Sequence, residues 1–519
     1  MKGDSAIVLC TLNARYIHAS LGLRYLLANM GDLSGQTDLC EFIVTRDPQE
    51  IVSELLSRHP QIVGLGVYIW NVAATTQVVR LLKSQRPQLR VVLGGPEVSH
   101  ELSEQAIVSL ADHVITGWGD VSFPKLCQAL LFGPPPLTKT IAGEEPGLDQ
   151  IALPYTHYSA TDLAHRVLYV EASRGCPFRC EFCLSSLDKK TRAFDLDRFL
   201  AAMDALYQRG ARNFKFVDRT FNLKTDSAMR ILQFFLDRIS PELFVHFEVI
   251  PDHLPDSLKE LIAMFPNGVL QLEVGVQTFN EEVQRRISRK QDNVRTEANL
   301  RWLLSHSSAH IHADLIFGLP GESPASFAAG FDRLYALRPH EIQLGVLKRL
   351  RGTPIARHTL THGMVYDTAP PFAVRQTAVL DACTTTRLVR LSRFWDLVAN
   401  SGRFAVTLGH LLQGPSAFAA FSQWCDWFWD ATRQTSGVTP ERLADALWVY
   451  LTEQRGFPQE TARQWLLSDY VASGARGSPA CLRGALVPRT APSRNAGPKI
   501  ARRQERHASK EGRLTTPSG

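Results

Sequence analysis

Short apolar runs alternate with amphipathic stretches along the first 145 residues of the chain. The apolar runs are rich in aliphatic side chains, which is typical of strands buried on both faces of a parallel sheet; they cover residues 6–10, 62–67, 91–95 and 113–117. The stretches between them carry apolar side chains at helical spacing, at 21–30, 48–57 and 73–83. This alternation predicts a doubly wound, Rossmann-like α/β domain over residues 1–145.

Polar and glycine residues follow each of these predicted strands. In an open parallel sheet, ligands bind at the carboxyl ends of the strands, and glycine there lets the backbone approach a large flat ligand closely. The candidates are Asn13, Tyr16 and His18 after the first run, Tyr68 and Trp70 after the second, Gly94, Gly95 and Glu97 after the third, and Gly117 and Gly119 after the fourth. Many Rossmann-like domains place glycine at these positions only to make tight turns.

A second alternation of strands and helices follows a segment rich in proline and glycine, which predicts a linker over residues 146–165 and a second α/β domain over 166–355. Six apolar runs are strand candidates, at 167–170, 214–218, 244–249, 269–276, 311–318 and 341–346. From residue 356 to 472 the pattern becomes helical. The aromatic residues between Phe418 and Trp429 fall mostly at i, i+3 spacing, which favours a helix packing face over a ligand site.

Three cysteines lie directly after the first strand of the second domain, in a C-x3-C-x2-C arrangement formed by Cys176, Cys180 and Cys183. Gly175 and Pro177 break the strand into a tight loop, so the thiolates can converge. Thiolates favour iron–sulfur clusters or zinc; a zinc site needs four ligands, and no fourth is nearby. A cubane cluster normally takes four cysteines, so three leave one iron open for a substrate or cofactor.

Charge and cysteine content divide the chain further. The net charge is +6, but residues 473–519 hold ten Lys/Arg against two Asp/Glu, so the rest is close to neutral and nucleic-acid binding is not expected. This tail has few large apolar side chains and is predicted to be disordered.

Nine scattered cysteines indicate a reducing compartment. No secretory signal or membrane-length apolar run is recognisable, so we expect a cytoplasmic protein without membrane association.

The cysteine motif resembles that of the radical S-adenosylmethionine (SAM) enzymes, C-x3-C-x-aromatic-C, with Phe182 at the aromatic position. The resemblance implies that Cys176, Cys180 and Cys183 are the metal ligands of a [4Fe–4S] cluster whose fourth iron is chelated by SAM. One electron would then cleave SAM to methionine and a 5′-deoxyadenosyl radical. It also implies that the six predicted strands form a partial (β/α)6 barrel with its chemistry at the carboxyl ends of the strands.

Other segments of this domain resemble SAM-binding motifs of the same family. Asp218 stands where the family has a Gly-Gly-Glu-like segment, and is the candidate contact to the SAM amino group. Glu273 and Gln277 lie in a Glu-x-Gly-x-Gln-Thr segment, and Gly318 and Gly321 lie in the turn at 314–322, which would form part of the adenine wall. Arg289 is either a fork for the SAM carboxylate or, as we favour, part of a solvated basic helix face with Arg285 and Arg286.

The N-terminal domain resembles the cobalamin-binding domain of B12-dependent radical SAM enzymes through its Gly-Gly-Pro-Glu loop at 94–97 and its Gly-x-Gly-Asp loop at 117–120. The resemblance implies cobalamin contacts from Gly94, Gly95, Glu97, Gly117 and Gly119, and from Tyr68 or Trp70 under the corrin, although these two are equally well explained as core aromatics. No D-x-H-x-x-G motif is present, and we interpret His18 as a loop or pocket residue.

Residues 394–404 resemble a stretch of the C-terminal domain of the DUF4080 type, which accompanies some B12-binding radical SAM proteins. The predicted fold is therefore α/β, with a Rossmann-like cobalamin-binding domain, a central partial (β/α)6 radical SAM barrel and a mostly helical C-terminal domain. This last domain would close over the mouth of the barrel.

The function that the resemblance implies is a cobalamin-dependent radical SAM enzyme that methylates an unactivated carbon of an unknown small-molecule or peptide substrate. A reductant such as flavodoxin or ferredoxin would supply the electron. Ring formation or rearrangement with the same cofactors is the alternative reaction, and a non-catalytic iron–sulfur or corrin-binding sensor is the alternative class. No catalytic residue is assigned beyond the three cysteines.

Overall fold

The computed structural model describes residues 5–475, 477–485, 503–504 and 506–507. Its N-terminal domain is a six-stranded parallel sheet with the strand order β2-β1-β3-β4-β5-β6, flanked by helices. The strands are β1 (Ile7–Asn13), β2 (Thr37–Ile43), β3 (Ile62–Gly66), β4 (Arg90–Gly94), β5 (His113–Thr116) and β6 (Thr140–Ala142). The helices are α1 (Leu21–Ala28), α2 (Pro48–Leu56), α3 (Val72–Gln85), α4 (Ala106–Leu110) and α5 (Ser122–Phe132).

Four of these strands match the predicted apolar runs, and two were not predicted. β2 alternates buried and partly exposed residues because it is an edge strand covered mainly on one face. β6 is a three-residue edge strand with an exposed Thr140, so it has no apolar run to detect.

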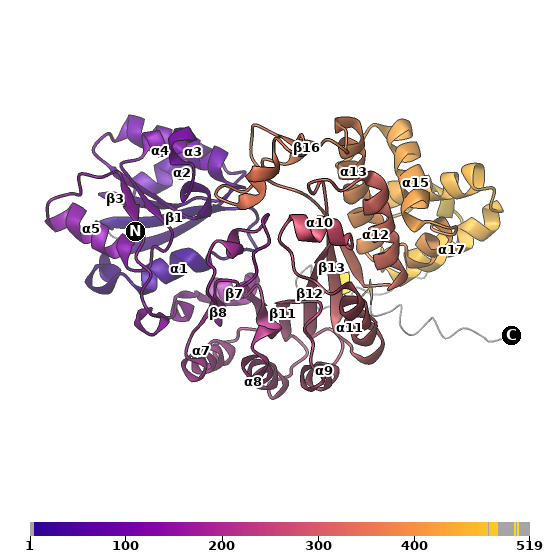
Figure 1. The fold of residues 1–519 in the computed structure, drawn as a ribbon, viewed down its shortest axis with the longest axis horizontal. Helices are drawn as coiled ribbons and strands as arrows, with labels where there is room; N and C mark the ends of the chain where they lie inside the picture. The colour runs from indigo at the N-terminus through magenta and orange to yellow at the C-terminus, as the bar shows by residue number, and fades with distance from the viewer. Residues whose placement is uncertain (1–4, 476, 486–502, 505, 508–519) are drawn as a thin grey trace.

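The second domain is a partial barrel of six parallel strands in the order β14-β13-β12-β11-β10-β7. All six correspond to predicted runs: β7 (Leu168–Val170), β10 (Asn213–Phe216), β11 (Phe244–Val249), β12 (Leu270–Gln277), β13 (His310–Phe317) and β14 (Glu341–Val346). The helices that cover its outside are α7 (Leu196–Gln208), α8 (Thr225–Leu236), α9 (Asp256–Ala263), α11 (Asn293–His306) and α12 (Pro324–Ala336), while the short α10 (Glu281–Arg286) lies at the carboxyl ends of the strands. Figure 1 shows the helices α7, α8, α9 and α11 side by side around the outer face of the strands.

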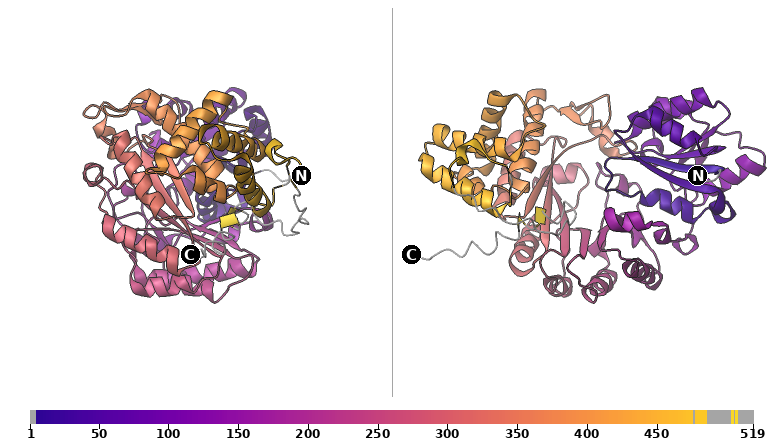
Figure 2. Two further views of the ribbon diagram at one scale, coloured as in Figure 1. Left: turned by 90° about the vertical axis from the view of Figure 1, so that its right-hand side faces the viewer. Right: turned by 180° about the vertical axis from the view of Figure 1, so that it is seen from behind.

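The C-terminal part is helical, as predicted. A two-stranded hairpin of β15 (Val365–Tyr366) and β16 (Val374–Gln376) precedes α13 (Ala382–Trp395), α14 (Ala405–Leu411), α15 (Ala417–Thr432), α16 (Pro440–Val449) and α17 (Gln459–Ala472). The aromatic face of α15 is a packing face, since Phe421, Trp424 and Phe428 are fully buried and contact Phe394 or Trp395 on α13. α15 also packs against α12, so these helices lie beside the barrel wall rather than over its mouth (Figures 1 and 2).

The prediction of disorder from Ser473 onward is wrong for the described part of the tail. Residues 480–482 form a short 3₁₀ helix, in which Leu482 is buried in the core and the Cys481 N–H donates to Asp445 at 2.8 Å. Arg503 pairs with Glu341 and Asp396. These few anchoring residues offset the ordering entropy locally although the composition of the tail is polar. The other tail residues lie outside the described part.

Candidate active site

The cysteine loop follows β7 and is closed by a small hairpin of β8 (Ser173–Arg174) and β9 (Arg192–Ala193). Gly175 has a positive φ of 86°, and a Cβ atom there would lie 2.2 Å from the carbonyl oxygen of Lys190. Only glycine fits this turn. The Cys176 N–H donates to the Asp188 carbonyl at 3.1 Å, which holds the start of the loop against the far side of the hairpin.

The three cysteine thiols lie within electrostatic reach of one another. Burial, together with the charged forms of Cys183 and Cys180, raises the pKa of Cys176 to about 11. Within the described ranges, no three His, Cys, Asp or Glu side chains are grouped so that they could chelate a single metal ion. A cubane cluster offers a separate iron to each thiolate, so a three-thiol loop of this kind suits a cluster better than a mononuclear metal.

Two arginines face the cysteine loop. The Arg289 Nη1 atom lies 3.6 Å from the Cys180 sulfur, and the same side chain donates to the Gly275 carbonyl. The solvated-helix interpretation of Arg289 is therefore wrong, because the residue lies after the end of α10 and turns inward. The Arg219 Nη1 atom donates to both carboxylate oxygens of Glu248, at 2.6 and 2.7 Å. Glu248 raises the pKa of Arg219 most, and Cys183 contributes in the same direction. Both guanidiniums are placed to stabilise negative charge at the loop.

A buried carboxylate ties the cysteine loop to the barrel. Glu181, between two of the cysteines, accepts from Ser288 at 2.5 Å and lies 2.8 Å from the Nε2 atom of His358. It also pairs with Arg357. Backbone hydrogen bonds from Glu181 N–H to Ile287 and from Ile355 N–H to Glu181 complete the attachment. Sequence analysis did not single out this residue, since it occupies a variable position of the motif.

The predicted SAM contacts have different surroundings in the structure. Asp218 is buried beneath the loop, where it accepts from the Ala172 N–H at 3.0 Å and the Ser173 hydroxyl at 2.5 Å, and burial raises its pKa to about 7. This carboxyl supports the loop from below. Gln277 has a positive φ of 67° at a bulge of β12 and lines a 240 Å³ pocket with Phe182 and Asp314.

Glu273 belongs to a polar cluster inside the barrel. Its carboxylate lies 3.0 Å from the His246 Nε2 atom and 3.5 Å from the Lys215 Nζ atom. Burial acts to raise the pKa of Glu273, but the hydrogen bond from His246 and the charge of Lys215 hold it below its ordinary value. The neighbouring Asp314 has a raised pKa, because it is buried beside the charge of Glu273. Burial and charge thus separate the pKa values of the two carboxyls, which favours the charged form of Glu273 and the neutral form of Asp314.

Gly318 and Gly321 are explained by their surroundings within the protein. A Cβ atom at Gly318 would lie 2.4 Å from Val374, and one at Gly321 would lie 2.0 Å from the Arg286 guanidinium. Both have positive φ angles. Their place in an adenine wall stays a prediction.

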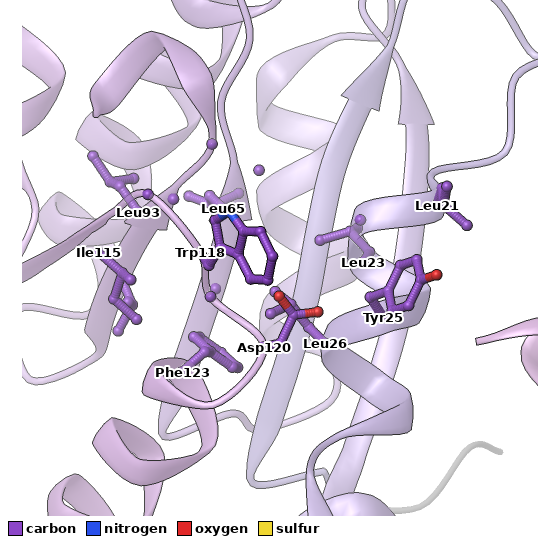
Figure 3. Close-up of a pocket in the computed structure, with 18 of the residues that line it drawn as sticks. Leu21, Leu23, Tyr25, Leu26, Leu65, Leu93, Ile115, Trp118, Asp120 and Phe123 are labelled. Carbon is purple, nitrogen blue, oxygen red and sulfur yellow. The ribbon is translucent and has the colours of Figure 1, made fainter. Parts of the chain in front are cut away.

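A cavity of 320 Å³ lies at the carboxyl edge of the N-terminal sheet (Figure 3). Leu93, Ile115 and Phe123 lie on one side of it and Leu23 and Tyr25 of α1 on the other. Of the residues predicted to bind cobalamin, Tyr68, Gly94, Gly95, Gly117 and Gly119 line it. Three further glycines, Gly22, Gly64 and Gly66, were missed, although the alternate glycines of β3 were a visible signal.

Two predicted cobalamin contacts do not line this cavity. Trp70 is half-exposed and stacks on Tyr68, with ring centroids 4.4 Å apart and its Nε1 atom donating to the Leu12 carbonyl. Glu97 is buried and pairs with Arg351 at 2.8 Å, so it anchors its loop to the segment that follows the barrel. The pair with Arg351, 254 positions away in the sequence, explains why Glu97 is buried. The sequence of the loop around Glu97 does not indicate this partner.

Arg174 connects this cavity with the cysteine loop. Two residues before Cys176, it lines the cavity and pairs with Asp120 at 2.8 Å and with Glu171 at 2.7 Å. Its guanidinium also lies over the rings of Tyr25 and Trp118, at 4.4 and 4.8 Å from their centroids. The wall of the N-terminal cavity therefore includes the first strand of the loop hairpin.

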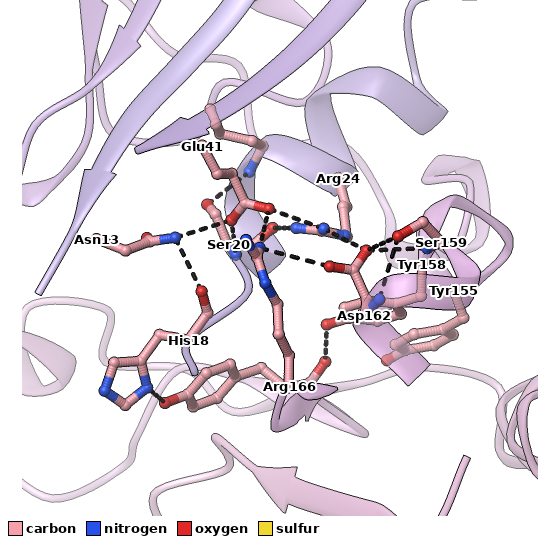
Figure 4. A network of polar contacts seen from close by, with 12 residues as sticks. Asn13, His18, Ser20, Arg24, Glu41, Tyr155, Tyr158, Ser159, Asp162 and Arg166 are labelled. Carbon is pink, nitrogen blue, oxygen red and sulfur yellow. Dashed lines mark hydrogen bonds and ion pairs between the residues drawn. The ribbon is translucent and has the colours of Figure 1, made fainter. Parts of the chain in front are cut away.

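The two domains also meet through a buried network of polar contacts (Figure 4). Arg24 of α1 pairs with Glu41 at 2.9 Å and with Asp162 of α6 (Ala160–His165) at 2.8 Å. His18 lies beside the network, with its Nδ1 atom 2.7 Å from the Tyr169 hydroxyl on β7. His18 thus faces the barrel and does not line the cavity of the N-terminal sheet.

Comparison with known proteins agrees with this architecture. Family models match at residues 170–334 for the radical SAM superfamily, at 7–127 for the B12 binding domain, and at 360–496 for a protein of unknown function (DUF4080). The fold, the cysteine loop and the match over residues 170–334 place that part of the chain in the radical SAM superfamily. The matches over 7–127 and 360–496 add a B12 binding domain and a DUF4080 domain, the combination expected of a B12-binding radical SAM protein.

Three similar proteins illustrate the range of the family. The chain is 29% identical over 250 residues to an uncharacterized methyltransferase from Pyrococcus horikoshii, covering 42% of this chain and 53% of that protein. It is 25% identical over 315 residues to the 2-(S-pantetheinyl)-carbapenam-3-carboxylate methyltransferase of Streptantibioticus cattleyicolor, covering 54% and 46%. The chain spans about half the length of these curated relatives.

The solved structure of the cobalamin-dependent SAM radical enzyme OxsB, with aqua-cobalamin and SAM bound, shares the fold with a TM-score of 0.59 at 12% identity. The match covers 99% of this chain and 85% of that one. None of the helices among the described residues combines the length and apolar character that a membrane span requires.

Proposed function

We propose that this protein is a cobalamin-dependent radical SAM methyltransferase that acts on an unactivated carbon of a small molecule or peptide. The observation that carries the proposal is the position of Arg174, which lines the cavity of the B12-binding domain and begins the cysteine loop. Two cofactor sites that share a residue are close enough to serve one substrate. The similarity to two methyltransferases supports methyl transfer as the outcome.

Cys176, Cys180 and Cys183 would hold a [4Fe–4S] cluster, and the glycine-lined cavity would hold part of cobalamin. When bound, these groups would supply reductive cleavage of SAM and a transferable methyl group. Arg289 and Arg219 would stabilise the charge at the cluster, Asp218 and Glu181 would fix its loop, and Glu273 and Gln277 would orient SAM. Glu273 is held charged by Lys215 and His246, which suits an acceptor for a hydroxyl or ammonium group.

The electron would come from a reductant such as flavodoxin or ferredoxin, and we place the protein in the cytoplasm. All nine cysteines are free of disulfides, which supports a reducing compartment.

The test is anaerobic reconstitution of the full chain with iron, sulfide and cobalamin, followed by reduction in the presence of SAM. We expect 5′-deoxyadenosine in the wild type and none in the Cys176→Ala, Cys180→Ala and Cys183→Ala variants. A variant that still forms it contradicts the cluster assignment. Retention of cobalamin absorption after gel filtration tests the second site separately, and a Gly117→Trp variant, which fills the cavity, should lose it.

A further inference from the structure

A larger cavity, of about 980 Å³, lies at the other end of the barrel from the cysteine loop. It is enclosed by the ends of α11 and α12, the start of β14 and the helices α13, α14 and α17. His340 and Ile342 bring the first residues of β14 to its wall, whereas the cysteine loop follows the last residue of β7. Since the barrel strands are parallel, the two sites are separated by the length of the strands. Its volume is in the range of small-molecule sites.

The wall of this cavity combines apolar side chains with positive charge. The apolar part consists of Leu304, Leu337, Ile342, Trp395, Leu408 and Leu412. The charged lining residues are Arg338, Arg506, Arg301, which pairs with Glu297 at 2.8 Å, and a single acid, Asp469. The Asp469 carboxylate accepts the backbone N–H groups of Val406 and Thr407, both at 2.8 Å, so its charge is directed to the start of α14. The balance of charge favours an anion.

A π-helical turn on the cavity wall is a further feature that is typical of a ligand site. Residues 396–400 form a π-helical turn after α13, and Ala399 and Asn400 lie on the cavity wall; such turns occur frequently at functional sites. The Asn400 side chain fixes the turn to β14, accepting from the Ile342 N–H at 3.0 Å and donating to its carbonyl at 2.9 Å.

Trp395, which precedes this turn, is 2% exposed and also lines the cavity. Its indole ring belongs to the apolar part of the wall, together with the leucines.

We propose that this cavity binds an amphipathic carboxylate, with its apolar body against the leucines and Trp395 and its charge beside Arg338 and Arg301. The site is separate from the proposed methyl transfer and does not depend on it. Arg338 is exposed at the rim and has a left-handed backbone, with φ of 58°.

The test uses the full chain without added cofactors and the fluorescent probe anilinonaphthalene sulfonate, an apolar aromatic anion. We expect saturable binding that dodecanoate displaces and dodecyltrimethylammonium, of the same chain length but opposite charge, does not. Arg338→Glu should weaken dodecanoate binding about tenfold or more, because like charges then meet at the rim. Leu408→Trp should weaken probe binding by filling the apolar part.

Arg433→Glu is the matched control, since Arg433 also has a positive φ, of 52°, and ends α15 away from the cavity. The Arg433→Glu variant should bind dodecanoate with the same affinity as the wild type. The proposal is overturned if binding is not saturable, if the cationic chain displaces the probe equally well, or if Arg338→Glu and Arg433→Glu behave alike. Unfolding midpoints of the variants show that each has folded; Arg338 is exposed, so its replacement should leave the midpoint unchanged.

Discussion

At the scale of single residues, Gly95 is fixed by its backbone and its neighbours together. Its φ is 107°, and a Cβ atom would lie 2.5 Å from the Val67 carbonyl oxygen. We predict that Gly95→Ala destabilises the N-terminal domain by about 1–3 kcal/mol, because the residue must leave this conformation or push β3 and β4 apart.

Gly94→Ala is the control for this prediction. Gly94 lines the same cavity, but its Cβ would come no closer than 3.9 Å to another atom, the Ile115 carbonyl oxygen. The melting temperature of the Gly94→Ala variant, measured by calorimetry, should be near that of the wild type. Equal melting temperatures for Gly95→Ala and the wild type would show that the loop can rearrange at no cost.

Glu322 is the residue whose titration should affect stability most plainly. It is buried, accepts from the Thr278 hydroxyl at 2.6 Å, and has a pKa raised to about 7 by burial. The pKa of Glu322 in the unfolded chain is about 4.3. Between about pH 4.3 and pH 7 the folded protein therefore binds more protons than the unfolded chain. The contribution of protonated Glu322 to the free energy of unfolding is lost as the pH rises through the folded pKa. We predict that Glu322→Gln is more stable than the wild type at pH 8, by up to about 3 kcal/mol, and similar at pH 4.

Melting temperatures of both proteins across this pH range would measure the difference. Glu282→Gln serves as the control, because Glu282 is exposed in its pair with Arg286. A parallel pH dependence for wild type and Glu322→Gln would mean that folding does not change the pKa of Glu322.

At the scale of elements, the cysteine loop depends on Glu181. We predict that Glu181→Ala detaches the loop from residues 354–358, because the buried His358 and the partly buried Ser288 lose their acceptor, at about 1.5–3 kcal/mol for each hydrogen bond to the charge. Hydrogen exchange of residues 176–183 in cluster-free protein should become at least about tenfold faster. Glu282→Ala, which removes an exposed carboxylate, should leave the exchange rates of this loop unchanged. If Glu282→Ala accelerated exchange as much as Glu181→Ala does, the effect would not be specific to the contacts of Glu181.

The elements themselves were largely predictable, since buried parallel strands leave apolar runs that need no tertiary information. The six barrel strands and the cysteine loop follow from local pattern. β2 and β6 were missed because edge strands carry a weak pattern, and the roles of Arg174, Glu97 and Glu181 could not be predicted because each is set by partners from another part of the chain. Leu482 shows the same limit in the tail, where one buried side chain orders a polar segment.

At the scale of the whole molecule, the two α/β domains are held by buried charge. Arg24 is 2% exposed and joins α1 to Glu41 on β2 and to Asp162 in the segment that leads into the barrel. Arg166 pairs with the same two acids, at 2.8 and 3.4 Å, and the Arg24 guanidinium lies over Tyr158. Such a network fixes the orientation of the domains, and with it the placement of Arg174 between the cavity and the cysteine loop.

We therefore predict that Arg24→Ala destabilises the protein by up to about 3–5 kcal/mol, since it leaves the two buried carboxylates with Arg166 in place of two arginine partners. Calorimetry should show the N-terminal domain melting before the barrel. Arg24→Met, which fills the space without charge, should keep the same defect, because Glu41 and Asp162 stay charged. Arg46→Ala breaks only the exposed pairs with Glu50 and Glu54 and should cost no more than about 1 kcal/mol. If Arg24→Ala and Arg46→Ala had the same melting temperature, apolar contacts would hold the two domains together. The buried charges would then set the orientation of the domains without stabilising the protein.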